Sequence, residues 1–492
     1  MSNLSQSHRM LFLNTLAFTI CFACWTLNGV LVTFLVDRGI FNWSVVEVGW
    51  LLGIPILSGA IFRLPIGILT DKFGGKIIYS ALLFLCAIPL FLLPYANSFW
   101  SFAVLSFLFG LVGTSFAVGI AYTSVWYPKN WQGRALGIFG MGNAGAAITT
   151  FVAPTLLNYF SKEDAVNGWK MLPVSYAIVL VCIGLVFVVF TKNKKPEGES
   201  KNLKTLLTPL KSARVWRFGV YYFLVFGCFV AYSQWLLPNF MNVYHTTLVM
   251  GGMFATMFSL PGGVVRALGG YLSDKYGARQ VMYWVLGSTM AISFLLMFPK
   301  MELFTSGPGI MANNAGVVSK VSEHGLVLNG NDYSIKPRVD GVLTDASVLP
   351  VKTSWQEIIV KENQTVKKKE LLAKGVTQIK FSANMWVYVI LVVLIGISWG
   401  IGKAAVYKHI PEYFPNEVGV VGGMVGLIGG LGGFFGPIIF SYLLNFTGLW
   451  TSSWLFIFVI STICLLWMHN TIIKILRKKN PDFSREIEHI NH

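Results

Sequence analysis

Residues 61–76 read IFRLPIGILTDKFGGK and residues 264–279 read VVRALGGYLSDKYGAR, so the chain contains one pattern twice. In each copy an arginine ends an apolar run, and an aspartate opens a polar turn eight residues later. Eight residues of helix rise ~12 Å, so each arginine should lie well inside a membrane-spanning helix. Two arginines at matching depth, Arg63 and Arg266, suggest an anion site between two halves of a membrane protein.

The composition of the chain indicates a polytopic membrane protein. It has 492 residues, of which 54% are hydrophobic and 12% charged, whereas about 25% of residues are charged in a typical soluble protein. Long apolar runs separated by short polar loops are typical of helices that cross a bilayer. The net charge of +17 comes largely from clusters beside these runs. Such clusters indicate cytoplasmic loops that face anionic lipid, and nucleic acid is not an expected partner.

The apolar runs predict twelve spans, six on each side of a basic linker. We expect the first set at 9–36, 45–69, 77–95, 98–126, 134–158 and 172–191, and the second at 216–240, 248–272, 280–299, 384–408, 418–443 and 450–473. The domain organisation that follows is a first half at 1–191, a cytoplasmic linker at 192–215, a second half at 216–299 and 384–475, an insertion at 300–383 and a tail at 476–492. Because Lys and Arg concentrate in alternate loops, both termini should face the cytoplasm, which places the chain in the cell inner membrane.

A second pair of segments supports the repeat. Residues 126–158 and 413–445 each begin with an aromatic residue and proline, Tyr127-Pro128 and Phe414-Pro415, and continue into a glycine-rich span. The turns Gly67-x-x-x-Asp71-Lys-Phe-Gly-Gly-Lys76 and Gly270-x-x-x-Asp274-Lys-Tyr-Gly-Ala-Arg279 resemble the loop motif of the major facilitator superfamily. The resemblance implies an all-α membrane fold of twelve helices in two six-helix halves, with the site near mid-membrane between them. Asp71 and Asp274 should then act in gating and not bind substrate.

The insertion at 300–383 does not belong to the repeat. Apolar and polar residues alternate around Asn329-Gly330 and again at 376–380, which predicts a small β module on the outer face. Residues 360–375 are faintly similar to a turn of lipoyl- or biotinyl-type domains, but the sequence pattern around an attachment lysine is missing. We therefore expect no cofactor, and the role of the insertion stays open.

Charged residues are scarce inside the predicted spans. Away from span ends we find Arg63, Arg266 and Lys403, with no Asp or Glu at comparable depth. Each buried charge costs roughly 2.5–3.5 kcal/mol on insertion scales, so these cations need a partner, and a substrate anion can supply it. Guanidinium suits a planar oxyanion because it donates two parallel hydrogen bonds. Three cations without a fixed counter-anion argue against a sugar, a cation or an apolar drug as substrate.

Two spans are unusually rich in glycine. Close helix packing explains part of this composition, and we also expect the glycines to let helices approach and slide around a narrow pore. They are Gly140, Gly142 and Gly145 in the fifth span, and Gly426, Gly429, Gly430, Gly432 and Gly433 in the eleventh.

Two glycine-rich spans combined with one arginine each in spans 2 and 8 resemble the nitrate/nitrite porter family. This resemblance implies that paired arginines clamp the anion, that an asparagine bonds it, and that aromatic rings sandwich it. The matching residues are Arg63, Arg266, Asn143, Phe116, Tyr222 and Phe226. The chain departs from the family pattern by its insertion at 300–383 and by Gly430, which stands where the repeat would place a second asparagine.

Lys403 should lie near mid-membrane, about 16 Å along its helix from the cytoplasmic end. It is a candidate for a third anion contact or for the group that couples transport to protons, since an ammonium can release its proton and a guanidinium cannot. This lysine favours nitrate–proton symport, with nitrate/nitrite exchange as the alternative. Rival functions are another small-anion carrier, or a membrane sensor that binds its ligand through the insertion. We expect no enzyme, because no Ser/His/Asp, Cys/His or metal constellation falls in a shared site. We expect no metal site, because the six cysteines fall inside apolar runs without metal-ligand spacing. We also expect a monomer.

Overall fold

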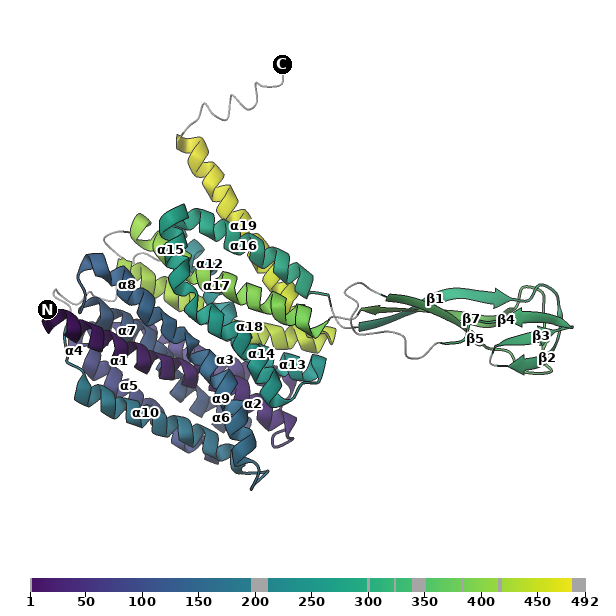
Figure 1. The fold of residues 1–492 in the computed structure, drawn as a ribbon, viewed down its shortest axis with the longest axis horizontal. Coiled ribbons are helices and arrows are strands. Elements are labelled where there is room, and N and C mark those ends of the chain that lie inside the picture. Colours follow the sequence, from purple (N-terminus) through teal and green to yellow (C-terminus); the bar gives the residue numbers. More distant parts are fainter. Residues whose placement is uncertain are drawn as a thin grey trace, which may run out of the picture. The chain divides into compact units, whose positions relative to one another are not determined.

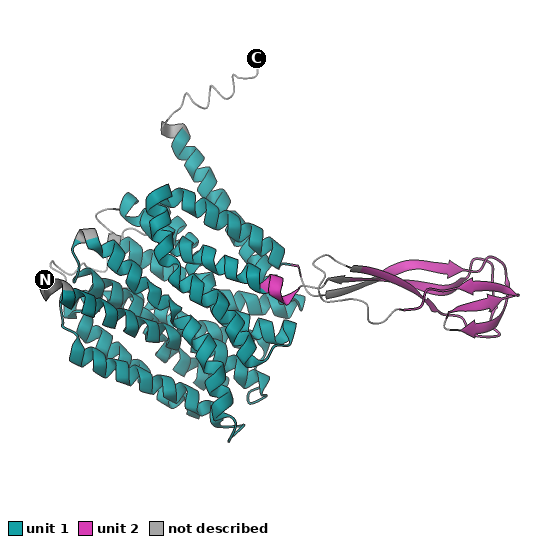
Figure 2. Cartoon of the chain, in the orientation of Figure 1, with its two compact units in different colours: residues 1–297, 389–492 teal, residues 298–388 magenta. Residues whose placement is uncertain are grey.

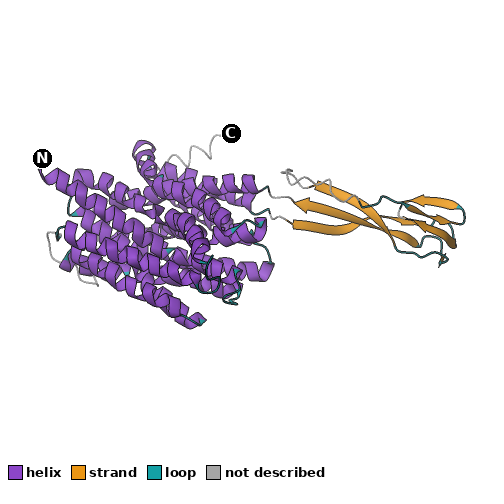
Figure 3. Ribbon diagram, turned by 60° about the horizontal axis from the view of Figure 1, so that its bottom comes forward, coloured by secondary structure: helices purple, strands orange, loops and turns teal. Residues whose placement is uncertain are grey.

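The computed structural model describes residues 2–195, 211–298, 301–322, 324–338, 351–381, 384–414 and 418–479. They form two compact units, residues 1–297 with 389–492, and residues 298–388 (Figure 2). The first unit is helical, and the described strands all lie in the second (Figure 3). Most of the predicted linker (196–210), Pro415 of the second repeat and the tail from residue 480 lie outside the described residues.

Most spans of the N-terminal half consist of two or three helical segments in sequence (Figure 1). In chain order these segments are α1 (Ser2–Trp25), α2 (Leu27–Asp37), α3 (Val45–Ile61), α4 (Arg63–Phe73), α5 (Gly75–Leu92), η1 (Leu93–Tyr95), α6 (Phe99–Phe109), η2 (Gly110–Thr114), α7 (Ser115–Ser124), α8 (Lys129–Gly140), η3 (Met141–Ala144), α9 (Gly145–Phe160), η4 (Gly168–Lys170) and α10 (Met171–Phe190).

The C-terminal half repeats this arrangement and ends with three long helices. Its segments are α12 (Ala213–Tyr222), the π-helix η6 (Phe223–Cys228), α13 (Phe229–Tyr244), α14 (Leu248–Val264), α15 (Arg266–Tyr276), α16 (Ala278–Leu296), α17 (Met385–Tyr413), α18 (Val418–Thr447) and α19 (Ser452–Lys479).

The described helices confirm the polytopic membrane fold. Ten of them are long and apolar enough to cross a bilayer, and the bent pair α14 and α15 makes an eleventh. Helix α16 occupies the predicted ninth span and falls outside that set. The first and seventh spans are the most enclosed, with 83% and 89% of their most apolar stretch buried, whereas the values for the sixth and twelfth are 33% and 22%. The first and seventh spans therefore have similar environments, as do the sixth and twelfth, which agrees with a six-helix repeat.

Both copies of the quoted pattern contain the same helix break. Helix α3 ends at Ile61 and α4 begins at Arg63, while α14 ends at Val264 and α15 begins at Arg266 after a bend of 43°. In both copies the second helix, α4 or α15, is followed by a glycine with positive φ, 91° at Gly74 and 87° at Gly277. Glycine adopts this conformation without the steric penalty of a Cβ, which explains its place in both turns.

The second unit contains two small antiparallel sheets. One has the order β1-β7-β5 and the other β4-β3-β2-β6. A hairpin turns at Asn329 and Gly330, both at positive φ, and β7 includes 376–380, as the alternating residues predicted. The strands are β1 (Met301–Met311), β2 (Gly316–Ser322), β3 (Gly325–Leu328), β4 (Asn331–Ser334), β5 (Val351–Ile358), β6 (Thr365–Val366) and β7 (Leu371–Phe381). The unit has its own apolar core, formed by Ala312, Val318, Leu326, Leu328, Val360, Val366 and Leu372.

Candidate anion site between the two halves

The two arginines of the repeat are buried at the breaks of their spans. Arg63 is 3% exposed and Arg266 is 8% exposed, and each is the first residue of a helix. An anion beside either break would therefore interact favourably with the guanidinium.

Arg63 joins the two halves directly. Its Nη1 donates to the carbonyl oxygen of Gly426 at 2.6 Å, across 363 residues of sequence, and its Nε donates to Gly113 at 3.4 Å. Its Nη2 is buried and has no hydrogen-bond partner in the described part of the chain. Three aromatic rings lie around the guanidinium, with centroids 5.3, 5.4 and 5.5 Å from its Cζ; they belong to Trp25, Phe116 and Phe226.

Arg266 approaches the same place from the other half. Its Cζ lies 5.6 Å from the ring centroid of Phe116 and 5.5 Å from that of Tyr407. Its Nη1 is likewise buried, without a hydrogen bond to any described residue. The stem of Arg266 passes Gly140, where an added Cβ would lie 3.1 Å from its Cδ. A larger residue than glycine at this position would crowd the guanidinium.

Aromatic rings from both halves face one another between the arginines. The rings of Phe116 and Phe226 are close to parallel, with an interplanar angle of 24° and centroids 6.3 Å apart. A flat ion between two rings needs about 7 Å, twice the usual contact distance of carbon atoms, so a small displacement would admit one. Tyr222 stacks on Phe226 at 4.9 Å and meets Tyr407 edge to face at 4.9 Å. Phe226 lies in the π-helix η6, a rare distortion that is frequent at functional sites.

Asn143 brings an unpaired amide to the same region. It lies in η3 with 0% exposure, and neither its Oδ1 nor its Nδ2 has a hydrogen-bond partner among the described residues. An added Cβ at Gly263, one turn before Arg266, would contact the backbone of Asn143 and Ala144 at 2.8–3.2 Å. The η3 segment therefore packs against the helix that ends at the Arg266 break.

The glycines of the two signatures allow these close approaches. In the eleventh span, a Cβ at Gly430 would lie 2.8 Å from the Cβ of Ala60, and one at Gly432 would lie 2.6 Å from the carbonyl oxygen of Phe223. A Cβ at Gly429 would overlap the ring of Tyr222. The span thus packs closely against spans 2 and 7, and the remaining signature glycines have similar contacts: Gly142 with Phe18, Gly145 with Thr19, Gly426 with Tyr407, and Gly433 with Ile56.

Lys403 lies beside this site and has other partners. The side chain is 0% exposed, and its Nζ donates to the carbonyl oxygen of Gly262 at 3.1 Å. The same nitrogen lies 3.0 Å from the ring centroid of Phe229, so a cation–π contact and one hydrogen bond hold the ammonium. Gly262 is four residues before Arg266 in the broken span. Lys403 therefore contacts the helix turn that precedes Arg266. Its aromatic contact, Phe229, differs from the rings around Arg266.

The two motif aspartates lie away from the arginines, near the ends of α4 and α15. Asp274 forms an ion pair with Lys408 of α17, with its Oδ1 2.5 Å from the lysine Nζ. Both side chains are more than 40% exposed, so the pair contributes little to stability. Asp71 is exposed as well. The structure thus separates the motif residues from the candidate site.

Two residues of the site were missed by the sequence reasoning. Trp25 holds its ring against Arg63 and donates from Nε1 to the carbonyl oxygen of Pro55 at 2.8 Å. Tyr407 contacts both Tyr222 and Arg266, and its hydroxyl donates to Gly422 at 3.0 Å. A signal for Tyr407 was present, because it follows Lys403 by one helical turn and shares its helix face.

The arrangement is suited to binding a small anion. The buried charged side chains of the described residues are all basic or histidine, with no carboxylate among them. Buried groups are normally hydrogen-bonded, and an unpaired one costs about 1–3 kcal/mol, more if charged. Unpaired atoms of Arg63, Arg266 and Asn143 therefore indicate a place where a ligand with several oxygens would complete the structure.

Comparison with known proteins shows the family of the chain. The model of the Major Facilitator Superfamily matches residues 13–319 and 371–488. A "Probable nitrate/nitrite antiporter NarK1" of Thermus thermophilus is 36% identical over 487 residues, which are 98% of this chain and 95% of that protein. A "Nitrite extrusion protein" of Bacillus subtilis is 28% identical over 64% of this chain and 78% of its own length. A "Probable nitrate transporter NarT" of Staphylococcus aureus is 24% identical over 94% of this chain and 95% of its own length.

A solved structure shows the same fold. It is a bacterial homologue of the human lysosomal transporter Spinster in an inward-facing, unoccupied conformation, with a TM-score of 0.58 over 94% of this chain and 96% of that one. At 14% sequence identity, the similarity extends to the fold alone.

Proposed function

The chain belongs to the major facilitator superfamily and to its nitrate/nitrite porters, and from this premise we propose that it carries nitrate and nitrite across the membrane by alternating access. The observation that carries the proposal is the set of buried, unpaired donors contributed by both halves, on Arg63, Arg266 and Asn143. Nitrate is planar, and its three oxygens accept hydrogen bonds in one plane. After a small separation of the near-parallel rings of Phe116 and Phe226, its two faces would contact aromatic surface.

The proposed cycle follows from the position of the arginines in opposite halves. An anion bonded to both guanidiniums would hold the halves together around it and let the loaded carrier change its facing. Without the anion, two like charges near one ring repel each other in a poorly solvated place. The empty carrier should therefore reorient slowly unless another group relieves this repulsion.

Lys403 is the group that we propose for that role. Its ammonium has a single carbonyl acceptor and one ring, and Gly262 connects it to the Arg266 break. Loss of its proton would remove one of three neighbouring positive charges, so that protons and nitrate could enter together as symport. Among the described residues its ammonium contacts Gly262 and Phe229 and none of the rings around the arginines, which favours coupling over a third anion contact. The second candidate is nitrate/nitrite exchange, supported by the name of the Thermus thermophilus relative.

The orientation of the chain is part of the proposal. We place it as a monomer in the cell inner membrane, with both termini and the 192–215 linker in the cytoplasm and residues 300–383 outside. The excess of Lys and Arg in alternate loops supports this orientation. The division into two halves at the linker rests on the sequence repeat and on the matching helix breaks.

The decisive experiment is nitrate and nitrite counterflow in proteoliposomes, with and without a proton gradient. Symport predicts nitrate accumulation driven by an inward proton gradient, whereas exchange predicts counterflow that the gradient leaves unchanged. Absence of both fluxes in a folded protein would reject the transport proposal. Nitrate binding by residues 298–388 in that case would favour the sensor function instead.

A further inference from the structure

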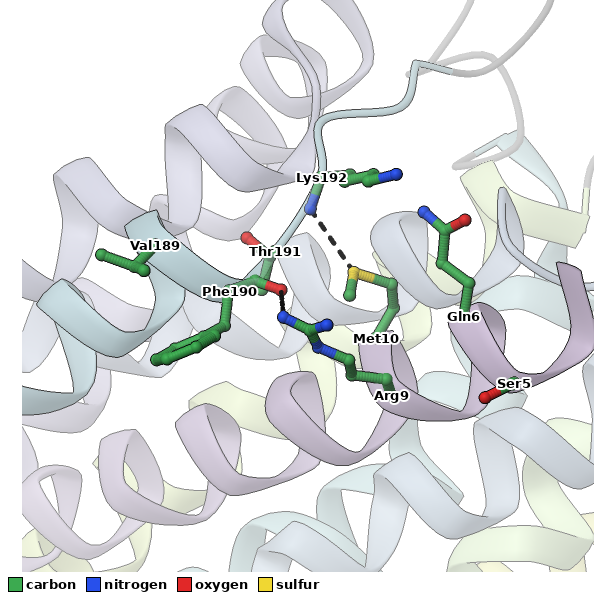
Figure 4. Close-up of a pocket in the computed structure, with 8 residues that line it drawn as sticks. All are labelled: Ser5, Gln6, Arg9, Met10, Val189, Phe190, Thr191 and Lys192. Atoms are coloured by element: carbon green, nitrogen blue, oxygen red, sulfur yellow. Dashed lines mark hydrogen bonds between the residues drawn. The ribbon is translucent and has the colours of Figure 1, made fainter. Parts of the chain in front are cut away.

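A pocket lies between two segments that are about 180 residues apart in sequence. It is lined by the start of α1 and by the residues where α10 ends, and its volume is about 350 Å³ (Figure 4). The lining residues are Ser5, Gln6, Arg9, Met10, Val189, Phe190, Thr191 and Lys192. None of them belongs to the candidate anion site, and the proposed transport does not use them.

Arg9 is held in place at this pocket by α10. Its Nη2 donates to the carbonyl oxygen of Phe190 at 3.1 Å, and its Cζ lies 5.5 Å from the ring centroid of the same residue. The backbone nitrogen of Lys192 meets the sulfur of Met10 at 3.4 Å, which also joins the two segments (Figure 4). A guanidinium has five N–H donors, and this bond engages one of them, so the exposed head of Arg9 keeps donors for a ligand.

The pocket is positively charged. Its lining contains Arg9 and Lys192 and no acidic residue. Lys76 is close by, with its Nζ donating to the carbonyl oxygen of Thr191 at 2.9 Å. Lys194 lies two residues beyond Lys192, over the ring of Trp126. Guanidinium and ammonium groups are the side chains that most often bind phosphate oxygens.

One wall of the pocket continues into an apolar surface. Val189 and Phe190 are 68% and 50% exposed, and Leu185 on the preceding turn is 54% exposed. Helix α10 is the least enclosed span of the N-terminal half, so this surface faces the acyl chains of the bilayer. A ligand that fills the pocket and also covers this surface would combine an anionic head, such as a phosphate, with a hydrocarbon tail.

We propose that this pocket binds the headgroup of an anionic glycerophospholipid from the leaflet on its side of the membrane. The phosphodiester accepts hydrogen bonds from Arg9 and Lys192, and an acyl chain lies along Val189 and Leu185. The bound lipid connects the start of the first span with the first residues after the sixth, where the predicted linker between the halves begins. This inference is independent of which anion the carrier transports.

Native mass spectrometry of the full chain in a neutral detergent tests the proposal. The probes are dioleoylphosphatidylglycerol and dioleoylphosphatidylcholine at equal concentration. The wild-type chain should retain at least one more phosphatidylglycerol than phosphatidylcholine, and Arg9→Gln/Lys192→Gln should lose that lipid. The matched control, Arg214→Gln/Lys474→Gln, removes two exposed charges elsewhere on the expected cytoplasmic side and should keep it. Unchanged thermal unfolding with phosphatidylcholine alone shows that the variants are folded.

Three results would overturn the proposal. One is an equal number of phosphatidylglycerol adducts in the wild type and in Arg9→Gln/Lys192→Gln. Another is equal loss in the control variant, which would mean that attraction by the general positive charge retains the lipid. The third is displacement of the lipid by glycerol 3-phosphate or inorganic phosphate at the same concentration, because the pocket would then be a site for a soluble phosphate.

Discussion

Arg63 and Arg266 come from opposite halves of the chain and hold their guanidiniums over one ring, with Cζ atoms 5.4 and 5.6 Å from the centroid of Phe116. The two positive charges can therefore lie no further apart than the sum of these distances. Each guanidinium also keeps one buried nitrogen without a partner in the described structure. Two like charges so placed need a counter-anion, and its arrival would draw the halves together.

Replacing either arginine by lysine should abolish most transport. Arg63→Lys and Arg266→Lys each keep the charge but lose the planar pair of donors, and hydrogen bonds to charged groups contribute about 1.5–3 kcal/mol. We expect nitrate uptake into proteoliposomes to fall about tenfold or more. The control is Arg38→Lys, at an exposed arginine outside the site, which should leave uptake unchanged. Uptake near the wild-type rate in either site variant would reject the clamp.

Two buried asparagines should respond to alanine in opposite ways. Asn143→Ala removes an amide without hydrogen bonds, so we expect unchanged or higher thermal stability and about tenfold weaker nitrate binding. Asn28→Ala removes an Nδ2 that donates to Leu51 at 2.7 Å and to Ser106 at 3.0 Å. That loss should lower stability by about 1–3 kcal/mol and leave nitrate affinity unchanged. Thermal unfolding with and without nitrate measures both effects, and a destabilised Asn143→Ala with normal affinity would contradict the assignment.

Two glycines of α18 offer a matched pair for the role of close packing. A Cβ at Gly429 would overlap the ring of Tyr222, whereas one at Gly423 meets nothing within 4 Å. Gly429→Ala should therefore displace Tyr222, cost about 1–3 kcal/mol of stability and reduce transport. Gly423→Ala should be neutral or stabilise the helix by about 0.5–1 kcal/mol. Equal uptake and equal unfolding temperatures for the two variants would show that Tyr222 does not need this space.

Lys403→Met should separate proton coupling from anion binding. The variant loses the titratable ammonium, and we expect it to lose nitrate accumulation driven by a proton gradient while it keeps nitrate/nitrite counterflow. Lys403→Arg should give the same pattern, because a guanidinium stays charged through the cycle. Coupled uptake that survives in Lys403→Met would exclude this residue as the coupling group. Loss of counterflow as well would assign it to the anion site or to the structure around Gly262.

The strand-containing unit should fold without the helical one. Residues 298–388 have their own apolar core, so the isolated segment should give a β-type circular dichroism spectrum and a cooperative thermal transition. Val318→Asp places a charge at a fully buried core position and should abolish that transition. The isolated unit should bind no nitrate, and measurable binding by calorimetry would support the sensor function.

The membrane fold, the repeat and the burial of the two arginines could be predicted from the amino-acid sequence. Hydropathy, loop charge and the doubled pattern are read along the chain, and each reflects a cost that the bilayer imposes on single residues or single helices. The glycines Gly74 and Gly277 are likewise explained locally, because the backbone conformation at a helix end depends on the residues next to it.

Which side chains share the site could not be predicted from the sequence, because it depends on contacts between helices that are distant in the chain. Arg63 bonds to Gly426 across 363 residues, and Lys403 bonds to Gly262 across 141. Such pairs depend on how the membrane helices are rotated and where they bend, and small rotations redirect side chains that have the same sequence spacing. For this reason the pattern could predict a charged lysine at mid-membrane but not its carbonyl partner. It also could not predict that Trp25 and Tyr407 would lie beside the arginines, because their neighbours come from other helices.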